Sequence, residues 1–203
     1  MIISHKYKFI FVKTRKTAGS TFEKLIRPYL GKDDICTGST RDGTEPLNCK
    51  PDMNGHVSIG KILENSFIDE HSGYDYITIE RNPYDKVVSS YYWHQTVKSE
   101  QFGNMDFETY VKTCNLLPVD WGLYTIKGEI PKHMKIFKYE DMTELYMWFK
   151  KMRGVNLLDK VAQTRLKSGY RKVKDYKELH TDITQRAVEI IFDKELKEFG
   201  YEF

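Results

Sequence analysis

KFIFVKTRKTAGSTFEKL, residues 8–25, passes from one hydrophobic periodicity to another within a few residues. Its apolar run, Phe9–Val12, is short and rich in β-branched and aromatic residues, which is typical of a buried strand. A polar turn, Lys13–Ser20, follows, and Gly19 gives this turn a backbone freedom that other residues lack. Beyond the turn, apolar residues recur at helical spacing, at Phe22, Leu25 and Ile26. The segment therefore predicts a strand, a turn and an amphipathic helix.

The turn has the composition of a phosphate-binding loop. A helix N-terminus presents backbone N–H groups and the positive end of the helix dipole to an anion, and a lysine adds a point charge. Lys16 precedes Gly19, so the loop differs from the nucleotide-triphosphatase pattern, which requires Gly-Lys-Ser/Thr. The alternative is a turn that only caps the helix. The candidate anion-binding residues are Lys16, Thr17, Ala18, Gly19, Ser20 and Thr21.

A second anion-binding position is predicted after another strand. The run Tyr74–Glu80 leads into Arg81-Asn82-Pro83, where the proline suits the first turn of a helix. An arginine at the carboxyl end of a parallel strand lies where open α/β sheets bind ligands. Ser89 lies about two turns into the following helix, and the pair Arg81 and Ser89 suits a terminal phosphate. Alternatively, Arg81 caps the strand end and Ser89 is an ordinary residue of the helix surface.

Strands and helices alternate along the remaining chain. This order predicts an α/β fold with a parallel sheet wrapped by helices. The length of 203 residues and the absence of a linker-like segment predict a single domain, residues 1–203. The other expected elements are a helix capped by Ser58, a helix over Phe107–Cys114, a strand over Met134–Tyr139, a helix over Thr143–Met152, and a long helix over Ile183–Glu198 that has Ala187, Ile190, Ile191 and Leu196 on one side and ends at Gly200.

Composition narrows the possible partners and compartment. The net charge of +3 is too small to indicate nucleic acid as the main partner. No apolar run approaches the ~20 residues of a membrane span, and the first residues do not resemble a signal peptide, so a cytoplasmic protein is expected. Three cysteines, Cys36, Cys49 and Cys114, favour reduced thiols, with a Cys36–Cys49 bridge as the alternative.

The two motifs together resemble those of sulfotransferases. Lys16–Thr21 is similar to the family's 5′-phosphosulfate loop, and the run Arg81-Asn82-Pro83-x-Asp-Lys-x-x-Ser-x-Tyr-Tyr is similar to its 3′-phosphate motif. Phe137–Asp141 resembles a further family strand, and Phe192–Tyr201 resembles its closing helix and tail. The similarity is closest to the compact carbohydrate-type enzymes of bacteria and viruses. It implies a three-layer, P-loop-like fold with a central parallel β-sheet flanked by helices.

The resemblance also implies an activity. The family transfers the sulfuryl group of 3′-phosphoadenosine 5′-phosphosulfate (PAPS) to an acceptor hydroxyl or amine, and releases 3′-phosphoadenosine 5′-phosphate (PAP). Lys16 would stabilise the leaving oxygen, the N–H groups of residues 18–21 would hold the 5′-phosphate, and Arg81 and Ser89 would hold the 3′-phosphate. The family requires no metal, and no metal-like spacing of Asp, Glu, His or Cys appears. Polar and aromatic residues in the predicted loops favour a carbohydrate acceptor.

Transfer to a hydroxyl requires a general base, and histidine titrates near neutral pH. His56 is the candidate because it precedes a helix and stands upstream of Arg81, where sulfotransferases often carry their base. The alternative is that His56 only caps that helix. His94, on the helix that carries Ser89, is the second candidate for the base.

Two regions extend or depart from the family pattern. Arg15 stands where the family usually has proline and Lys13 where histidine is frequent, so two additional cations flank the loop. They would attract the anion or contact the acceptor. Further along, the basic stretch Thr164–Lys172 resembles a family loop that closes over the nucleotide, and its alternative is a solvated run of charges. The nucleotide-binding candidates there are Arg165, Lys167 and Tyr170, with Tyr176 as an alternative stacking residue.

Two other functions remain open at this point. One is a catalytically silent nucleotide- or glycan-binding module on the same scaffold, which would keep the binding residues without a working base. The other is a nucleotide kinase-like phosphotransferase, which would require a Gly-Lys-Ser/Thr loop that the chain lacks.

Overall fold

The computed structural model describes residues 1–203 apart from 40–42, 50–54, 67, 69–71 and 162–168. By contacts within the chain it divides into two compact units, residues 1–80 with 122–166 and residues 81–121 with 167–203. That residues 1–203 form one domain stays a prediction. The elements are β1 (Ile2–Ser4), β2 (Phe9–Val12), α1 (Gly19–Ile26), η1 (Arg27–Tyr29), β3 (Ile35–Cys36), α2 (Ile59–Ser66), β4 (Asp75–Glu80), α3 (Pro83–Val97), α4 (Ser99–Phe102), α5 (Phe107–Thr113), α6 (Trp121–Tyr124), β5 (Met134–Lys138), η3 (Tyr139–Asp141), α7 (Met142–Arg153), α8 (Leu158–Val161), η4 (Tyr176–Leu179), α9 (Asp182–Ile191) and α10 (Asp193–Phe199).

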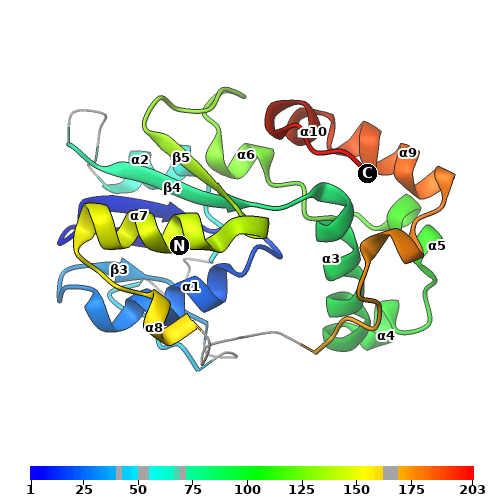
Figure 1. Ribbon diagram of the computed structural model, residues 1–203, viewed down its shortest axis with the longest axis horizontal. Coiled ribbons are helices and arrows are strands. Elements are labelled where there is room, and N and C mark those ends of the chain that lie inside the picture. Colours follow the sequence, from blue (N-terminus) through cyan, green and yellow to red (C-terminus); the bar gives the residue numbers. More distant parts are fainter. Residues whose placement is uncertain (40–42, 50–54, 67, 69–71, 162–168) are drawn as a thin grey trace. The chain divides into compact units, whose positions relative to one another are not determined.

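The first unit contains a five-stranded sheet in the order β3-β1-β2-β4-β5. Strands β2, β4 and β5 are parallel, with Val12 opposite Thr78 and Ile79 opposite Phe137. Helices flank the sheet, and Figure 1 shows α7 in front of it and α2 behind it. The predicted α/β architecture with a parallel centre is therefore confirmed.

The sheet as a whole is mixed, because β1 runs antiparallel to both of its neighbours, β2 and β3. The prediction of a central parallel sheet holds for β2, β4 and β5 and did not include this antiparallel edge. Strands β1 and β3 have three and two residues, too short for a periodic pattern to show in the sequence. Asp34 secures the turn between β1 and β2, since its carboxylate accepts hydrogen bonds from the backbone N–H groups of His5 and Lys6.

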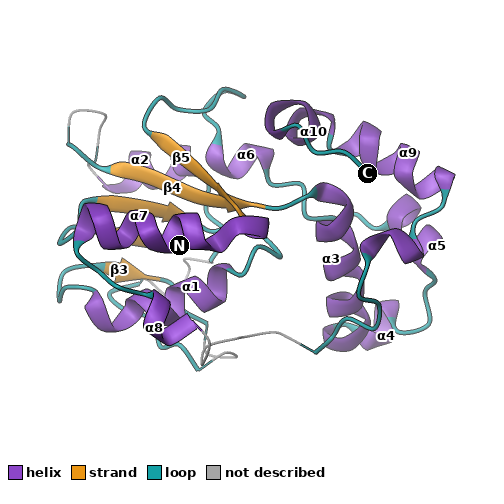
Figure 2. Ribbon diagram, viewed as in Figure 1, coloured by secondary structure: helices purple, strands orange, loops and turns teal. Residues whose placement is uncertain are grey.

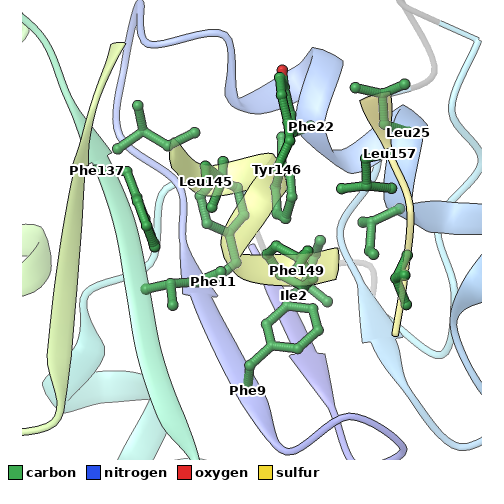
Figure 3. Packing of buried hydrophobic residues seen from close by; sticks show 14 of the residues in the cluster. Ile2, Phe9, Phe11, Phe22, Leu25, Phe137, Leu145, Tyr146, Phe149 and Leu157 are labelled. Carbon is green, nitrogen blue, oxygen red and sulfur yellow. The ribbon is translucent and has the colours of Figure 1, made fainter. Parts of the chain in front are cut away.

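The core of the first unit lies between the sheet and helices α1 and α7. Phe9 and Phe11 of β2 meet Phe22 of α1 and Phe149 of α7 in edge-to-face or tilted contacts, with ring centroids 4.7–5.3 Å apart. Figure 3 shows these rings packed together. Burial of such aromatic side chains is worth about 1.5–3 kcal/mol each, so this face fixes α1, and with it the loop before α1, against the sheet. Cys36 is a buried free thiol, which excludes the Cys36–Cys49 bridge in this structure.

In its described residues, the second unit consists of helices and loops (Figure 2). Asn82 caps α3 by accepting a hydrogen bond from the backbone N–H of Tyr84 at 3.0 Å, and Pro83 takes the first helical position. The predicted apolar face of α3 is confirmed, since its four members are buried: Val87, Val88, Tyr91 and Tyr92.

The predicted long helix over Ile183–Glu198 was wrong in two respects. It is divided at Phe192, which leaves helical geometry (φ −110°, ψ 26°) between α9 and α10. Its buried face is also different, because Ile190 is 68 % exposed whereas Val188 and Phe192 are fully buried. Turning the chain at Phe192 buries that ring in the core of the second unit. Gly200 ends α10 with φ 62°, as predicted.

Candidate functional site

The loop between β2 and α1 has an unusual backbone. Lys16 (φ 63°) and Ala18 (φ 60°) both adopt the left-handed conformation, which costs a non-glycine residue roughly 1–2 kcal/mol. Such conformations cluster at binding sites, where the surrounding structure enforces them. Helix α1 begins at Gly19, and Ala18 offers it no side-chain cap. The first turn of α1 therefore lies at the carboxyl end of β2 with the features of an anion-binding helix N-terminus.

Buried threonines attach this loop to the neighbouring strand. The Thr14 hydroxyl donates to the Ile79 carbonyl of β4 and lies 2.8 Å from the Thr17 hydroxyl. Thr78 of β4 donates in return to the Val12 carbonyl at 2.8 Å. The Thr17 side chain is fully buried in this network. Its predicted contact with a nucleotide therefore depends on its backbone, while Ser20 and Thr21 on α1 are also buried and Lys16 is half-buried.

Lys13 does not extend toward solvent as a flanking cation. Its side chain passes beneath the start of α1, so close that a Cβ added to Gly19 would lie 2.8 Å from the Lys13 Cγ. Its Nζ lies 2.5 Å from Oε2 of Glu23, and only 7 % of the side chain is exposed. We expected Lys13 to add to the charge facing a ligand. Instead, its ammonium group forms a buried ion pair with Glu23. Gly19 is required here because of the passing lysine, whereas the left-handed backbone of the turn falls on Lys16 and Ala18 and not on Gly19.

Glu23 is the centre of a buried charged cluster. Its Oε1 accepts hydrogen bonds from the Met1 amino group at 2.6 Å and from the Thr37 hydroxyl at 3.2 Å. Burial alone would raise the pKa of the Glu23 carboxyl. The Met1 amino group and Lys13 together lower this pKa by more than burial raises it, so it lies below its ordinary value. The carboxylate is therefore ionised at neutral pH and binds Lys13 together with the Met1 amino group, whose own pKa is lowered by burial.

The His56 side chain lies beside Lys13, the first residue of the loop between β2 and α1. Its Nδ1 is 2.8 Å from the backbone carbonyl oxygen of Lys13. A carbonyl can only accept, so Nδ1 carries the proton, and in the neutral ring Nε2 holds the lone pair. His56 is exposed at the surface of the first unit. A histidine with a fixed tautomer and an accepting Nε2 is the arrangement that a general base requires.

His94, the second candidate for the base, lies in the core of the second unit. Its Nδ1 is 2.8 Å from the Tyr110 hydroxyl, which donates in turn to Ser90 at 3.0 Å. The imidazole stacks on Phe102, with ring centroids 5.0 Å apart. Only 5 % of His94 is exposed, so its role is that of a hydrogen-bonded core residue.

The second unit brings two arginines together on one carboxylate. Asp85 Oδ2 accepts hydrogen bonds from Nε and Nη2 of Arg81, at 2.8 and 2.6 Å. Asp85 Oδ1 accepts from Nη1 of Arg171. The other Arg171 donors, Nε and Nη2, are buried and meet no hydrogen-bond acceptor within the described part of the chain. Because unsatisfied buried donors are costly, these two groups mark a position suited to an anion.

The remaining predicted nucleotide-binding residues have different outcomes. Ser89 is half-buried and follows Asp85 by four residues on α3, hence on the same helix face. Tyr170 packs against the core of the second unit. Tyr176 stacks on Tyr84, with ring planes 14° apart. Arg165 and Lys167 lie outside the described residues.

Two important residues were not singled out by the sequence. Glu23 stands between Phe22 and Lys24 on α1, so no clear signal in the sequence indicates that this carboxylate is buried. Arg171 belongs to the basic stretch, but its pairing with Asp85 joins positions far apart in sequence. No local pattern identifies such a partner.

The comparisons with known proteins add no family. No family model matches the chain, and no curated protein matches it. Within the described residues, no group of three His, Cys, Asp or Glu side chains is placed to hold a metal ion. Nor does any helix of those residues combine the length and apolar character needed to cross a membrane.

Proposed function

We propose that this protein is a PAPS-dependent sulfotransferase of P-loop-like, three-layer fold, acting in the cytoplasm on a hydroxyl or amine of an acceptor, with a carbohydrate as the preferred class. One observation carries the proposal. Lys13 opens the loop that precedes α1, and its carbonyl holds the Nδ1 proton of His56. A base with its accepting nitrogen defined therefore stands beside a loop with the features of a phosphate site.

Each unit, taken by itself, contains residues suited to one charged end of PAPS. In the first unit, the turn Lys16–Thr21 offers a lysine and a helix N-terminus to the 5′-phosphosulfate. In the second unit, Arg81, Ser89 and Arg171 suit the 3′-phosphate, and the two buried Arg171 donors that meet no acceptor among the described residues support this assignment. Arginine is well suited to the task because its planar fork binds two phosphate oxygens at once.

When bound, PAPS supplies a sulfuryl group whose bond to the 5′-phosphate oxygen breaks as a bond to the acceptor oxygen or nitrogen forms. Lys16 donates to the phosphate oxygen on which negative charge develops, and removal of one such donor typically costs about 10²–10³-fold in rate. His56 accepts the acceptor's proton at Nε2, a contribution of about 10²–10⁴-fold. The N–H groups of residues 18–21 hold the phosphate in place, so positioning and charge stabilisation provide most of the catalysis.

The direct test is transfer of radiolabelled sulfuryl from PAPS to a panel of mono- and oligosaccharides, with PAP release measured in parallel. Lys16→Met and His56→Ala are expected to reduce transfer at least about 100-fold. The matched controls, Lys24→Met on the exposed side of α1 and His133→Gln, are expected to remain near the parent rate. PAP binding without transfer to any acceptor would favour the silent binding module. Phosphoryl transfer from ATP would favour the kinase-like alternative.

A further inference from the structure

The buried position of Glu23 requires an explanation beyond stability. Its side chain is completely excluded from solvent and carries a charge. Burying a carboxylate costs several kcal/mol even when it is paired, and apolar replacements of buried ion pairs are often neutral or stabilising. An apolar residue at this position of α1 would leave the Met1 amino group, Lys13 Nζ and the Thr37 hydroxyl without the carboxylate that they share. The charge therefore suggests a role in positioning other groups.

Two connections lead from Glu23 to His56. Through Oε2, Glu23 binds the side chain of Lys13, whose backbone carbonyl accepts the Nδ1 proton of His56 at 2.8 Å. Through Oε1, it binds the Met1 amino group, which also donates to the carbonyl of Gly55 at 3.2 Å. Gly55 directly precedes His56. The cluster thus holds both the carbonyl opposite the imidazole and the backbone that carries the imidazole.

We propose that Glu23 is a positioning residue of the site, which acts through Lys13 to keep the proton on Nδ1 of His56 and the lone pair on Nε2. Glu23 touches neither the base nor any ligand position itself. The proposal rests on the proposed function for its catalytic meaning, because a fixed accepting nitrogen matters only where His56 removes a proton. Its structural content, control of the His56 tautomer by Glu23, stands independently of any reaction.

The test measures the tautomer and the kinetics of the same variants. ¹⁵N NMR of the imidazole at a pH where His56 is neutral is expected to show the Nδ1–H tautomer in the parent protein. Glu23→Gln is expected to shift His56 toward a mixture of tautomers and to lower kcat about 10- to 100-fold, less than loss of the base itself. The KM for PAPS is expected to change less than about threefold, because the binding donors remain in place. Glu23→Asp is expected to recover part of both effects.

Glu64→Gln, an exposed substitution on α2, is the matched control and is expected to change neither measurement. If Glu23→Gln does not fold, the apolar replacement Lys13→Met/Glu23→Leu removes the Lys13–Glu23 ion pair. The buried Met1 amino group, whose pKa is already lowered by burial, keeps the Thr37 hydroxyl and the Gly55 carbonyl as partners, so this variant is expected to fold with a mixed His56 tautomer. A folded variant that keeps the Nδ1–H tautomer and the parent kcat would overturn the proposal. A tautomer shift in a protein that transfers no sulfuryl group would overturn the proposed function and leave the role of Glu23 intact.

Discussion

Asp85 lies one helical turn beyond Arg81 and binds its guanidinium through a single carboxylate oxygen, Oδ2. The second oxygen is thereby left for Arg171, whose remaining donors are buried. The three side chains together carry one net positive charge. The Nε and Nη2 groups of Arg171 could therefore donate hydrogen bonds to an anion, and the first two predictions concern this position.

Arg171→Ala is expected to weaken PAP binding about 10²- to 10⁴-fold. Two hydrogen bonds to a charged phosphate would be lost, and each such bond is worth about 1.5–3 kcal/mol. ADP, which lacks the 3′-phosphate, is expected to bind the variant and the parent within about threefold of each other. Calorimetric titrations of both nucleotides check this, with the exposed Arg186→Ala as control. An equal loss of affinity for PAP and ADP would refute the assignment of Arg171 to the 3′-phosphate.

Asp85→Ala is expected to destabilise the protein by about 2–4 kcal/mol, because it leaves two neighbouring, mostly buried guanidinium groups without their shared carboxylate. A phosphate placed between the same arginines would replace part of that carboxylate. Saturating PAP is therefore expected to raise the thermal midpoint of Asp85→Ala by more than it raises that of the parent. Asp193→Ala, which breaks an exposed pair with Lys197, serves as control. A smaller PAP-dependent rise in the variant would count against an anion site at this position.

Gly19→Ala is expected to destabilise the protein by about 1–3 kcal/mol. The added methyl would lie 2.8 Å from Cγ of Lys13, a part of that side chain held by the ion pair with Glu23. The helical Gly60 on α2 has no atom within 4 Å of the same position, so Gly60→Ala is expected to stabilise by about 0.5–1 kcal/mol. Urea denaturation of both variants provides the measurement. Opposite signs support the tight passage of Lys13 beneath α1, and equal stabilisation by both alanines would contradict it.

Glu195→Gln is expected to stabilise the protein more at pH 8 than at pH 4. Burial raises the pKa of the Glu195 carboxyl, and attraction from Lys86 opposes this only in part, with Asp120 adding to the rise. A raised folded-state pKa means that Glu195 contributes most stability below the unfolded value, and that this contribution is lost as pH rises through the folded value. Its Oε1 is buried and meets no hydrogen-bond partner among the described residues. Thermal midpoints at the two pH values are the check, and a larger gain at pH 4 would be the wrong sign.

The strand–loop–helix segments were predictable from sequence because each combines a buried apolar run with a local signal. Phe9–Val12 matches β2, and Pro83 marks the first turn of α3 as expected. Strands β1 and β3 were not predicted, because they are defined by pairing with other strands and not by a pattern in their own residues. The division at Phe192 was hidden because α9 and α10 each have helical sequence and the burial of one ring separates them.

The candidate site shows the same limit. The loop at Lys16 and the position of Arg81 after β4 follow from local sequence. The partners that define their chemistry do not, because Lys13–Glu23 and Asp85–Arg171 are contacts made by folding. Lys13 illustrates the difference, since it reads as a cation beside the loop and lies instead in a buried ion pair.

The central claim is that the protein binds a nucleotide carrying a 3′-phosphate. Calorimetric titration of the full chain with PAP, ADP and ATP tests it most directly, with Arg81→Ala beside the parent and Arg186→Ala as control. The account predicts a clear preference for PAP over ADP and ATP that is largely lost in Arg81→Ala. Equal affinity of the parent protein for PAP and ADP would contradict it.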